Sequence, residues 1–374
     1  MQKNSRSAGE EENIMQIEYR LLPKHERKSP PPQGTVLSFG MLRTNHMFVM
    51  EYADNAWHNA RIVPYAPFSL MPGSMCFHYG QCFFEGVKAF KHEDGEIYIF
   101  RPEQNAARMN HSAEVLCMPF VPVEVQLDAI HRLVDVERDW CPSEPQSSLY
   151  IRPFMFATQD SLGVKPSATL IYCIILSPSG AYYKGGFNHA VRLLITKKYH
   201  RAVSGGTGSA KAAGNYAASI RPQIYAQSFG VDQVLYLSAD NTCIEEVGTM
   251  NHYHVLRDGT FIIPEFSDSI LRAVTSVSVL ELAAAGKIKA RREVVRLDAF
   301  IDGIRSGEII EAGGFGTAAV VSPVGGYVFE DGTELVVGDG GIGGHSRRLY
   351  EMYTSIQTGK APAPQGWLSK VPRF

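Results

Sequence analysis

The 374-residue sequence lacks the features of several classes of protein. It has no run near the ~20 apolar residues that a membrane-spanning helix needs, and its longest apolar stretch, ATLIYCIILS (168–177), is typical of a buried strand. Its six cysteines include no Cys-x-x-Cys pair, which argues against a zinc knuckle or a disulfide framework. The formal net charge is −2, so the sequence lacks the excess of positive charge that is typical of nucleic-acid-binding proteins. We therefore expect a cytoplasmic protein with reduced thiols, without metal, nucleic acid or membrane as a partner.

The sequence that is present divides into four parts. Residues 1–30 are polar and lack the apolar segment of a secretory signal, so a flexible lead-in is expected. Runs rich in β-branched and aromatic residues predict strands in a small N-terminal domain over 31–178. A glycine-containing stretch without an apolar period predicts an interdomain linker over 179–188, followed by a larger domain over 189–374.

The second half combines helical and strand patterns. Helices are predicted over 216–229 and 270–286, and a final one from His345 onward. Asp-Gly pairs at 258–259 and 331–332 lie between strand runs and are typical of hairpins. A regular βαβ alternation is absent, so the expected fold class is mixed α/β (α+β), with a second domain built on a barrel-like or curved sheet.

The stretch GGTGSAK (205–211) raises the question of phosphate binding. A Walker loop is excluded, because Ala210 and Ala212 occupy positions where that motif requires glycine and Ser or Thr. A second glycine-rich stretch, GDGGIG (338–343), matches a dinucleotide pattern, but no second strand follows to complete the βαβ unit. A glycine lead-in to the last helix is the simpler interpretation of GDGGIG.

Lys211 itself is the stronger candidate for chemistry. Its sequence neighbours are small and none is acidic. Such a lysine could form a Schiff base with a carbonyl group such as that of pyridoxal phosphate, although an ordinary surface lysine is the alternative. A carboxylate for the pyridine nitrogen could come from Glu245 or Glu246, and a helix beginning near Ala273 would offer backbone N–H groups to a phosphate.

Seven blocks of the sequence resemble, in order and spacing, those of the branched-chain aminotransferases, which have the class IV pyridoxal phosphate fold. They are FHYGQCFFEGVKAF, FRPEQNAARMNHSAEVLCMP, SLYIRPFMFAT, GGTGSAKAAGNYAAS, EEVGTMN, FGTAAVVSPV and SRRLYEMYTSIQTG. The resemblance covers residues 39–359. It implies a two-domain, D-amino acid aminotransferase-like architecture, with a smaller N-terminal α/β domain and a larger, barrel-like C-terminal domain that binds pyridoxal 5'-phosphate.

The resemblance also implies residue roles. Lys211 would be the Schiff-base lysine and the catalytic acid and base. The other cofactor residues implied are Tyr216 at the phenolic oxygen, Glu246 at the pyridine nitrogen, Arg108, Val274, Thr275 and Thr317 at the phosphate, and Arg201 beside the cofactor. The substrate residues implied are Phe39, Tyr79, Phe84, Tyr150, Thr249 and Ala318, with Arg152 for the second carboxylate of 2-oxoglutarate.

The implied function is ping-pong transamination of leucine, isoleucine and valine with 2-oxoglutarate and glutamate. A homodimer is implied, in which the partner's small domain completes the pocket. The sequence departs from the family pattern at Arg272, Ala273, Ser276, Gly313 and Phe315. These departures leave open a specialised aminotransferase for an unusual or aromatic amino acid, and a non-catalytic protein that binds pyridoxal phosphate is the alternative of a different class.

Overall fold

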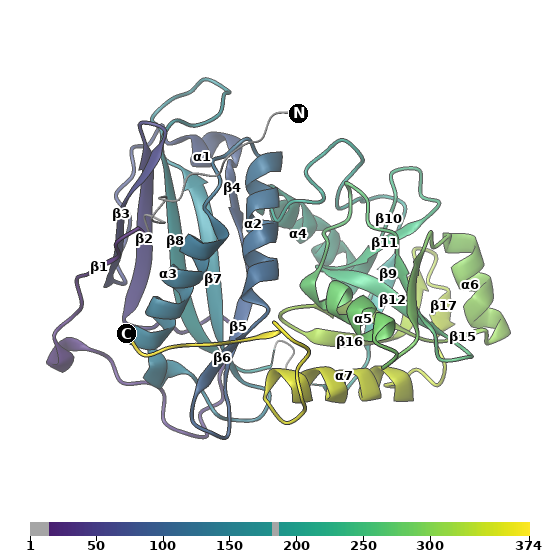
Figure 1. Cartoon of the computed structure of the whole chain (residues 1–374). Coiled ribbons are helices and arrows are strands. Elements are labelled where there is room, and N and C mark those ends of the chain that lie inside the picture. Colours follow the sequence, from purple (N-terminus) through teal and green to yellow (C-terminus); the bar gives the residue numbers. More distant parts are fainter. Residues whose placement is uncertain (1–14, 182–186) are drawn as a thin grey trace, which may run out of the picture.

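Two sheets organise the protein (Figure 1). The first is built mainly from the N-terminal half of the chain, with one strand from the C-terminal end, and the second is built from the C-terminal half. The computed structural model describes residues 15–181 and 187–374. The first part of the predicted lead-in and the middle of the predicted linker lie outside these residues. Within the described ranges, no helix is long and apolar enough to cross a membrane, and no group of three or more His, Cys, Asp or Glu side chains could hold a metal ion.

The first sheet has nine strands in the order β1-β3-β2-β8-β7-β5-β6-β18, with β4 paired to β7. Its members are β1 (Glu18–Tyr19), β2 (His46–Ala53), β3 (Ala56–Pro64), β4 (Cys82–Phe84), β5 (Val87–Lys91), β6 (Ile97–Phe100), β7 (Ser148–Ala157), β8 (Leu170–Ser179) and β18 (Leu368–Lys370). All pairs are antiparallel except β1 with β3. The long partners β7 and β8 are almost wholly buried, which confirms the strand predicted from the longest apolar run.

Two helices cover one face of this sheet, α2 (Pro102–Val115) and α3 (Val123–Val136). Helix α2 begins with a proline, which has no N–H to leave unpaired in a first turn. In α3, Ala129, Ile130, Leu133 and Val134 recur at helical spacing and are buried, so this stripe packs into the core beneath the sheet. The short helix α1 (Met75–Tyr79) lies before β4.

The second sheet also has nine strands, and six of them close into a ring: β9, β10, β11, β12, β15 and β16. Its members are β9 (Val191–Ile195), β10 (Gln233–Leu237), β11 (Ile244–Val247), β12 (Met250–Leu256), β13 (Phe261–Pro264), β14 (Ala290–Glu293), β15 (Ile309–Gly316), β16 (Val320–Phe329) and β17 (Glu334–Val336). The ring closes because β11 pairs with both β10 and β12. This confirms the barrel-like second domain.

Four helices surround the barrel: α4 (Ala213–Gln227), α5 (Val274–Ala284), α6 (Leu297–Ser306) and α7 (Gly344–Gln357). Helix α5 begins at Val274, not at residue 270, because Ala273 has an extended backbone with ψ 135°. Both predicted hairpins are present as β12–β13 and β16–β17. In each, the glycine of the Asp-Gly pair has a positive φ, 82° at Gly259 and 85° at Gly332.

The C-terminal segment leaves the barrel after α7 and returns to the first sheet. There β18 pairs with β6 through Leu368 and Phe100, and Figure 1 shows the tail (yellow) running back to the N-terminal half. The sequence patterns predicted no such strand, since the run LSK (368–370) is too short and polar to mark one.

Candidate active site

A cavity of about 210 Å³ lies between the first sheet and the barrel. The predicted residues that line it are Phe39, Phe84, Arg108, Tyr150, Arg152, Lys211, Tyr216, Glu246, Thr249, Thr317 and Ala318. They come from segments far apart in the sequence, including β4, α2, β7, α4, β11 and the loop between β15 and β16. The fold therefore gathers most of the predicted site in one place.

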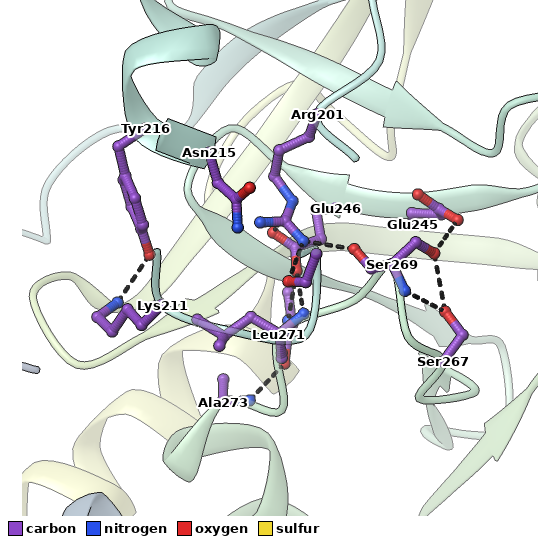
Figure 2. Close-up of polar contacts among 12 residues, drawn as sticks. Arg201, Lys211, Asn215, Tyr216, Glu245, Glu246, Ser267, Ser269, Leu271 and Ala273 are labelled. Atoms are coloured by element: carbon purple, nitrogen blue, oxygen red, sulfur yellow. Dashed lines mark hydrogen bonds and ion pairs between the residues drawn. The ribbon is translucent and has the colours of Figure 1, made fainter. Parts of the chain in front are cut away.

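Lys211 lies immediately before α4, which also carries Tyr216. The Lys211 Nζ atom donates a hydrogen bond to the Tyr216 hydroxyl at 2.8 Å, and Figure 2 shows the two side chains meeting. The Lys211 backbone is held from the other domain, because its N–H donates to the Ser112 hydroxyl and its carbonyl accepts from Phe84. The backbone from which the amine extends is therefore held in place, and the amine itself is bonded to Tyr216.

Burial lowers the pKa of Lys211 to about 8, and the nearby Arg108 guanidinium acts in the same direction. A lowered pKa increases the fraction of neutral amine, the form that attacks a carbonyl carbon. One of the glycines before the lysine is required by packing. A Cβ at Gly208 would lie 2.5 Å from the backbone of Ser269, so this close approach packs the loop against a neighbouring segment.

The structure distinguishes the two adjacent glutamates. Glu246 lines the cavity and is buried, whereas Glu245 accepts a hydrogen bond from the Ser269 hydroxyl (Figure 2). Burial raises the pKa of Glu246 to about 7, against the opposing influence of Arg201 and the Leu271 N–H. Glu246 is therefore the carboxylate that could share a proton with a group bound in the cavity.

Arg201 lies behind Glu246. The Arg201 Nε and Glu246 Oε2 atoms are 3.0 Å apart, but Arg201 Nε makes no hydrogen bond to any described residue, so the contact is an ion pair without good hydrogen-bond geometry. Glu246 Oε1 accepts from the Leu271 N–H at 2.8 Å. These contacts hold the carboxylate at the edge of the cavity while its charge is offset from behind.

Asn251 connects this carboxylate to helix α5. Its Nδ2 atom lies 3.4 Å from Glu246 Oε1 and donates to the Leu271 carbonyl at 2.7 Å. Its Oδ1 atom accepts from the Ala273 N–H and from the Ser276 hydroxyl. Asn251 therefore sets the spacing between Glu246 and the start of α5.

Helix α5 begins with Val274 and Thr275, and its N-cap residue Ala273 provides no side-chain hydrogen bond. The first N–H groups of such a helix have no partner within the helix and attract an anion. Val274, Thr275 and Thr317 line a small space next to the cavity. This arrangement provides donors for a phosphate.

Arg108 extends from α2 toward the same place. Its Nε and Nη2 atoms donate to the buried carboxylate of Glu85 at 2.7 and 2.8 Å, and its Nη1 atom donates to the Arg272 carbonyl. The guanidinium is thus held by Glu85 and lies beside the segment that leads into α5.

Aromatic rings form the other wall. The rings of Phe39 and Tyr150 meet edge to face at 4.8 Å, and the Arg152 guanidinium lies 4.6 Å above the Phe84 ring. Arg152 Nη2 donates to the Tyr150 hydroxyl, while its buried Nε atom has no hydrogen-bond partner among the described residues. A half-buried guanidinium with an unused donor suits a carboxylate ligand.

Tyr79 is not part of this cavity. It lies on α1 with 38% of its surface exposed, and its hydroxyl donates to the Leu162 carbonyl. Within one chain, therefore, the structure does not bring Tyr79 together with the other predicted residues.

Three residues of the site region were missed by sequence reasoning: Glu85, Asn251 and Lys88. Each lies in a block that carries the resemblance, but only its contacts reveal its part. Glu85 and Lys88 are charged residues among apolar ones in FEGVKAF, and that unusual placement is the signal that could have identified them.

A larger cavity, of about 490 Å³, lies on the other side of the 317–319 turn. Its lining includes Lys88, Ala318 and Tyr350, but not Lys211, Tyr216 or Glu246. The smaller cavity is the candidate active site because it brings together Lys211, Tyr216 and Glu246, and burial lowers the pKa of Lys211 and raises that of Glu246.

Comparison with known proteins agrees with this geometry. Residues 83–324 match the family model described as amino-transferase class IV. The chain therefore belongs to the class IV aminotransferases. The cofactor of this family is pyridoxal 5'-phosphate.

Its curated relatives share one description. Branched-chain-amino-acid transaminase 1 of Bacillus subtilis (strain 168) is 46% identical over 91% of this chain and 96% of its own. A branched-chain-amino-acid aminotransferase of Mycolicibacterium smegmatis is 40% identical over 89% of this chain and 92% of its own. These relatives span nearly the whole protein.

Solved structures have the same fold. The branched-chain amino acid aminotransferase of Escherichia coli has a TM-score of 0.73 at 23% identity, covering 88% of this chain and 99% of its own. The T.th. branched-chain amino acid aminotransferase, solved with pyridoxamine 5'-phosphate, has a TM-score of 0.69 at 27% identity, covering 86% of this chain and 98% of its own.

The donor set of the cavity fits pyridoxal phosphate. A buried amine, a phenol, a buried carboxylate and an open helix N-terminus are the groups that an aldehyde, a phenolic oxygen, a ring nitrogen and a phosphate require. These groups lie around the cavity and the small space next to it, in accordance with the family assignment.

Proposed function

We propose that this protein is a branched-chain amino acid aminotransferase, which transfers the amino group of leucine, isoleucine or valine to 2-oxoglutarate in a ping-pong reaction. The observation that carries the proposal is the contact of Lys211 with Tyr216 in a cavity that also contains Glu246. The names of the relatives support the choice of substrate.

Each residue has a task in this proposal. Pyridoxal phosphate, when bound, makes the substrate's Cα proton acidic by withdrawing electrons. Lys211 Nζ would take that proton from Cα and deliver it to the carbon of the cofactor that is joined to the substrate's nitrogen, and Tyr216 would orient the amine. The Glu246 carboxylate would stabilise a proton on the ring nitrogen from the edge of the cavity.

The same proposal assigns the remaining residues. Arg108, Thr317 and the N–H groups of Val274 and Thr275 hold the phosphate, and Arg201 sustains the charge of Glu246. The substrate's aliphatic side chain lies among Phe39, Phe84, Tyr150, Thr249 and Ala318, and Arg152 takes the second carboxylate of 2-oxoglutarate.

The structure bears on the departures from the family pattern. Ala273 and Phe315 both line the cavity, and the Phe315 ring is wholly buried against Tyr253 at 4.3 Å. Ser276 donates to Asn251, so it supports the start of α5. Because Ala273 and Phe315 bound the cavity without adding a charge to it, they favour an apolar substrate and give no support to a different reaction.

The proposal is tested with a panel of amino acids. Purified protein loaded with pyridoxal phosphate is mixed with leucine in the absence of an oxo acid, and the cofactor's absorbance is followed. We expect conversion to the aminated cofactor with leucine, isoleucine and valine, and slower conversion with phenylalanine or alanine. Conversion with aromatic amino acids alone would instead support the specialised enzyme. Failure with every amino acid, although the cofactor binds, would support the non-catalytic alternative.

We further propose that the protein is a homodimer. Apolar side chains are exposed on α1 and the neighbouring loop: Met71, Phe77, Leu162 and Val164 are 60–84% exposed. A patch of this kind on one face suits a self-complementary interface and would allow Tyr79 to reach a partner's pocket. Sedimentation velocity should give twice the chain mass of 41.3 kDa; a monomer that is fully active would contradict the proposal.

The domain limits of 31–178 and 189–374 and the cytoplasmic location are also proposals. The separate cores of the sheet and the barrel support a division at 179–188. The outer limits differ from the expected ones, because β1 and Ile17 before residue 31 and β18 and Val371 at the end of the chain belong to the first sheet and its core. All six cysteines are free, which suits a reducing compartment. Mass analysis of the protein's thiols after extraction from cells under trapping conditions would test the second, since disulfides would argue against it.

A further inference from the structure

Lys88 is a buried charge to which the proposed reaction assigns no task. It lies on β5 of the first sheet and is 9% exposed. Its hydrogen bond crosses to the barrel, where Nζ donates to the Ala318 carbonyl at 2.8 Å. No ion pair between Lys88 and an acidic side chain is found within the described ranges. A buried ammonium without a carboxylate is costly, so its presence calls for a function.

The segment that Lys88 contacts has a strained backbone. Residues 317–319 form the turn between β15 and β16, and Val320, directly after it, has φ 65°. A β-branched residue rarely adopts this left-handed conformation, which persists only where the surroundings enforce it. Lys88 supplies such a constraint because it binds the turn from outside.

The turn separates two spaces. Ala318 and Ala319 line both the candidate active site and the larger cavity behind it, and Lys88 lines the larger cavity. Lys88 also borders the small space around Val274 and Thr275. Burial lowers the pKa of Lys88 to about 8. Its ammonium therefore lies behind the turn, where its charge and its hydrogen bond act on the wall of the substrate site.

We propose that Lys88 is a positioning residue, which holds the 317–320 turn in the strained conformation that receives the substrate's α-carboxylate. By binding the Ala318 carbonyl, it fixes the orientation of the peptide group between Ala318 and Ala319, in a turn whose residues line the cavity. The proposal rests on the proposed function, because it assumes a carboxylate substrate at this turn. It also makes Lys88 a link between the two domains across the active site.

The test compares four cofactor-loaded proteins: the wild type, Lys88→Met, Lys88→Arg and Lys91→Met. Lys91 is the matched control because it lies on the same strand and its side chain is exposed. The ligand is 4-methylvalerate, which has leucine's carbon skeleton and carboxylate but no amino group. Its Kd is measured together with the KM for leucine, kcat and the affinity for pyridoxal phosphate.

We expect Lys88→Met to raise both the Kd for 4-methylvalerate and the KM for leucine about tenfold, with kcat and cofactor affinity nearly unchanged. Lys88→Arg should recover most of the loss, and Lys91→Met should equal the wild type. An unchanged Kd, or a loss confined to kcat and cofactor binding, would overturn the proposal.

Two further outcomes are informative. If Lys88→Met does not fold, Lys88→Gln takes its place, because the glutamine side chain is polar but uncharged and is one atom shorter than that of lysine. A wild-type Kd for 4-methylvalerate in Lys88→Gln would overturn the proposal. If the wild type itself neither binds 4-methylvalerate nor transaminates leucine, the proposed function fails, and the role of Lys88 fails with it for that separate reason.

Discussion

Replacing Lys211 by alanine is expected to reduce turnover with leucine by about 10⁴-fold or more, because the amine positioned to move the Cα proton is removed. The variant should still bind pyridoxal phosphate through the remaining contacts, at lower affinity and without a covalent bond. Single-turnover absorbance measurements with leucine give the rate, and gel filtration after addition of the cofactor shows whether it is retained.

Lys197→Ala is the control for Lys211→Ala, since Lys197 is exposed and lies outside the cavity. It should behave like the wild type. Addition of a small primary amine should restore part of the activity of Lys211→Ala, because a free amine can occupy the vacated space and accept the proton. A Lys211→Ala protein that turns over leucine at a wild-type rate would show that another group moves the proton.

Glu246→Gln is expected to reduce kcat by about 10²- to 10³-fold, since an amide cannot stabilise a proton on the cofactor's ring nitrogen as a carboxylate does. The substitution keeps the shape of the side chain, and the carbonyl oxygen of the amide can still accept from the Leu271 N–H. Cofactor binding should therefore weaken far less than catalysis. Steady-state kinetics with leucine and 2-oxoglutarate measure the loss.

Glu245→Gln is a matched control at the adjacent position. Glu245 bonds to Ser269 and does not line the cavity, so turnover in this variant should stay close to wild type. If Glu245→Gln lost the activity and Glu246→Gln kept it, the roles of the two glutamates would be exchanged.

The choice between these glutamates illustrates what the sequence could predict. Strand alternation shows that adjacent residues point to opposite faces, but it does not show which face meets the cofactor. The resemblance selected Glu246, and the fold places that carboxylate at the cavity. The two hairpins were predictable for a local reason, because an Asp-Gly pair determines the turn without help from distant residues.

The features that could not be predicted depend on contacts between distant segments. Helix α5 begins four residues later than its apolar pattern suggests, because Leu271 and Ala273 bond to Glu246 and Asn251. Arg108 donates two hydrogen bonds to the carboxylate of Glu85, which lies 23 positions away in the sequence and outside α2. Hydrophobic periodicity carries no information about such pairs.

The return of the chain to the first sheet has a consequence for how the protein is assembled. Because β1 and β18 both belong to that sheet, at its opposite edges, the barrel is inserted in the chain between strands of the first domain. The first domain cannot complete its edge until synthesis of the chain is almost finished, and until then β6 presents an unpaired edge to other chains. A ribosome-bound chain that stops before residue 368 would therefore already contain Lys211, the proposed catalytic lysine, yet would expose an unpaired strand edge to aggregation.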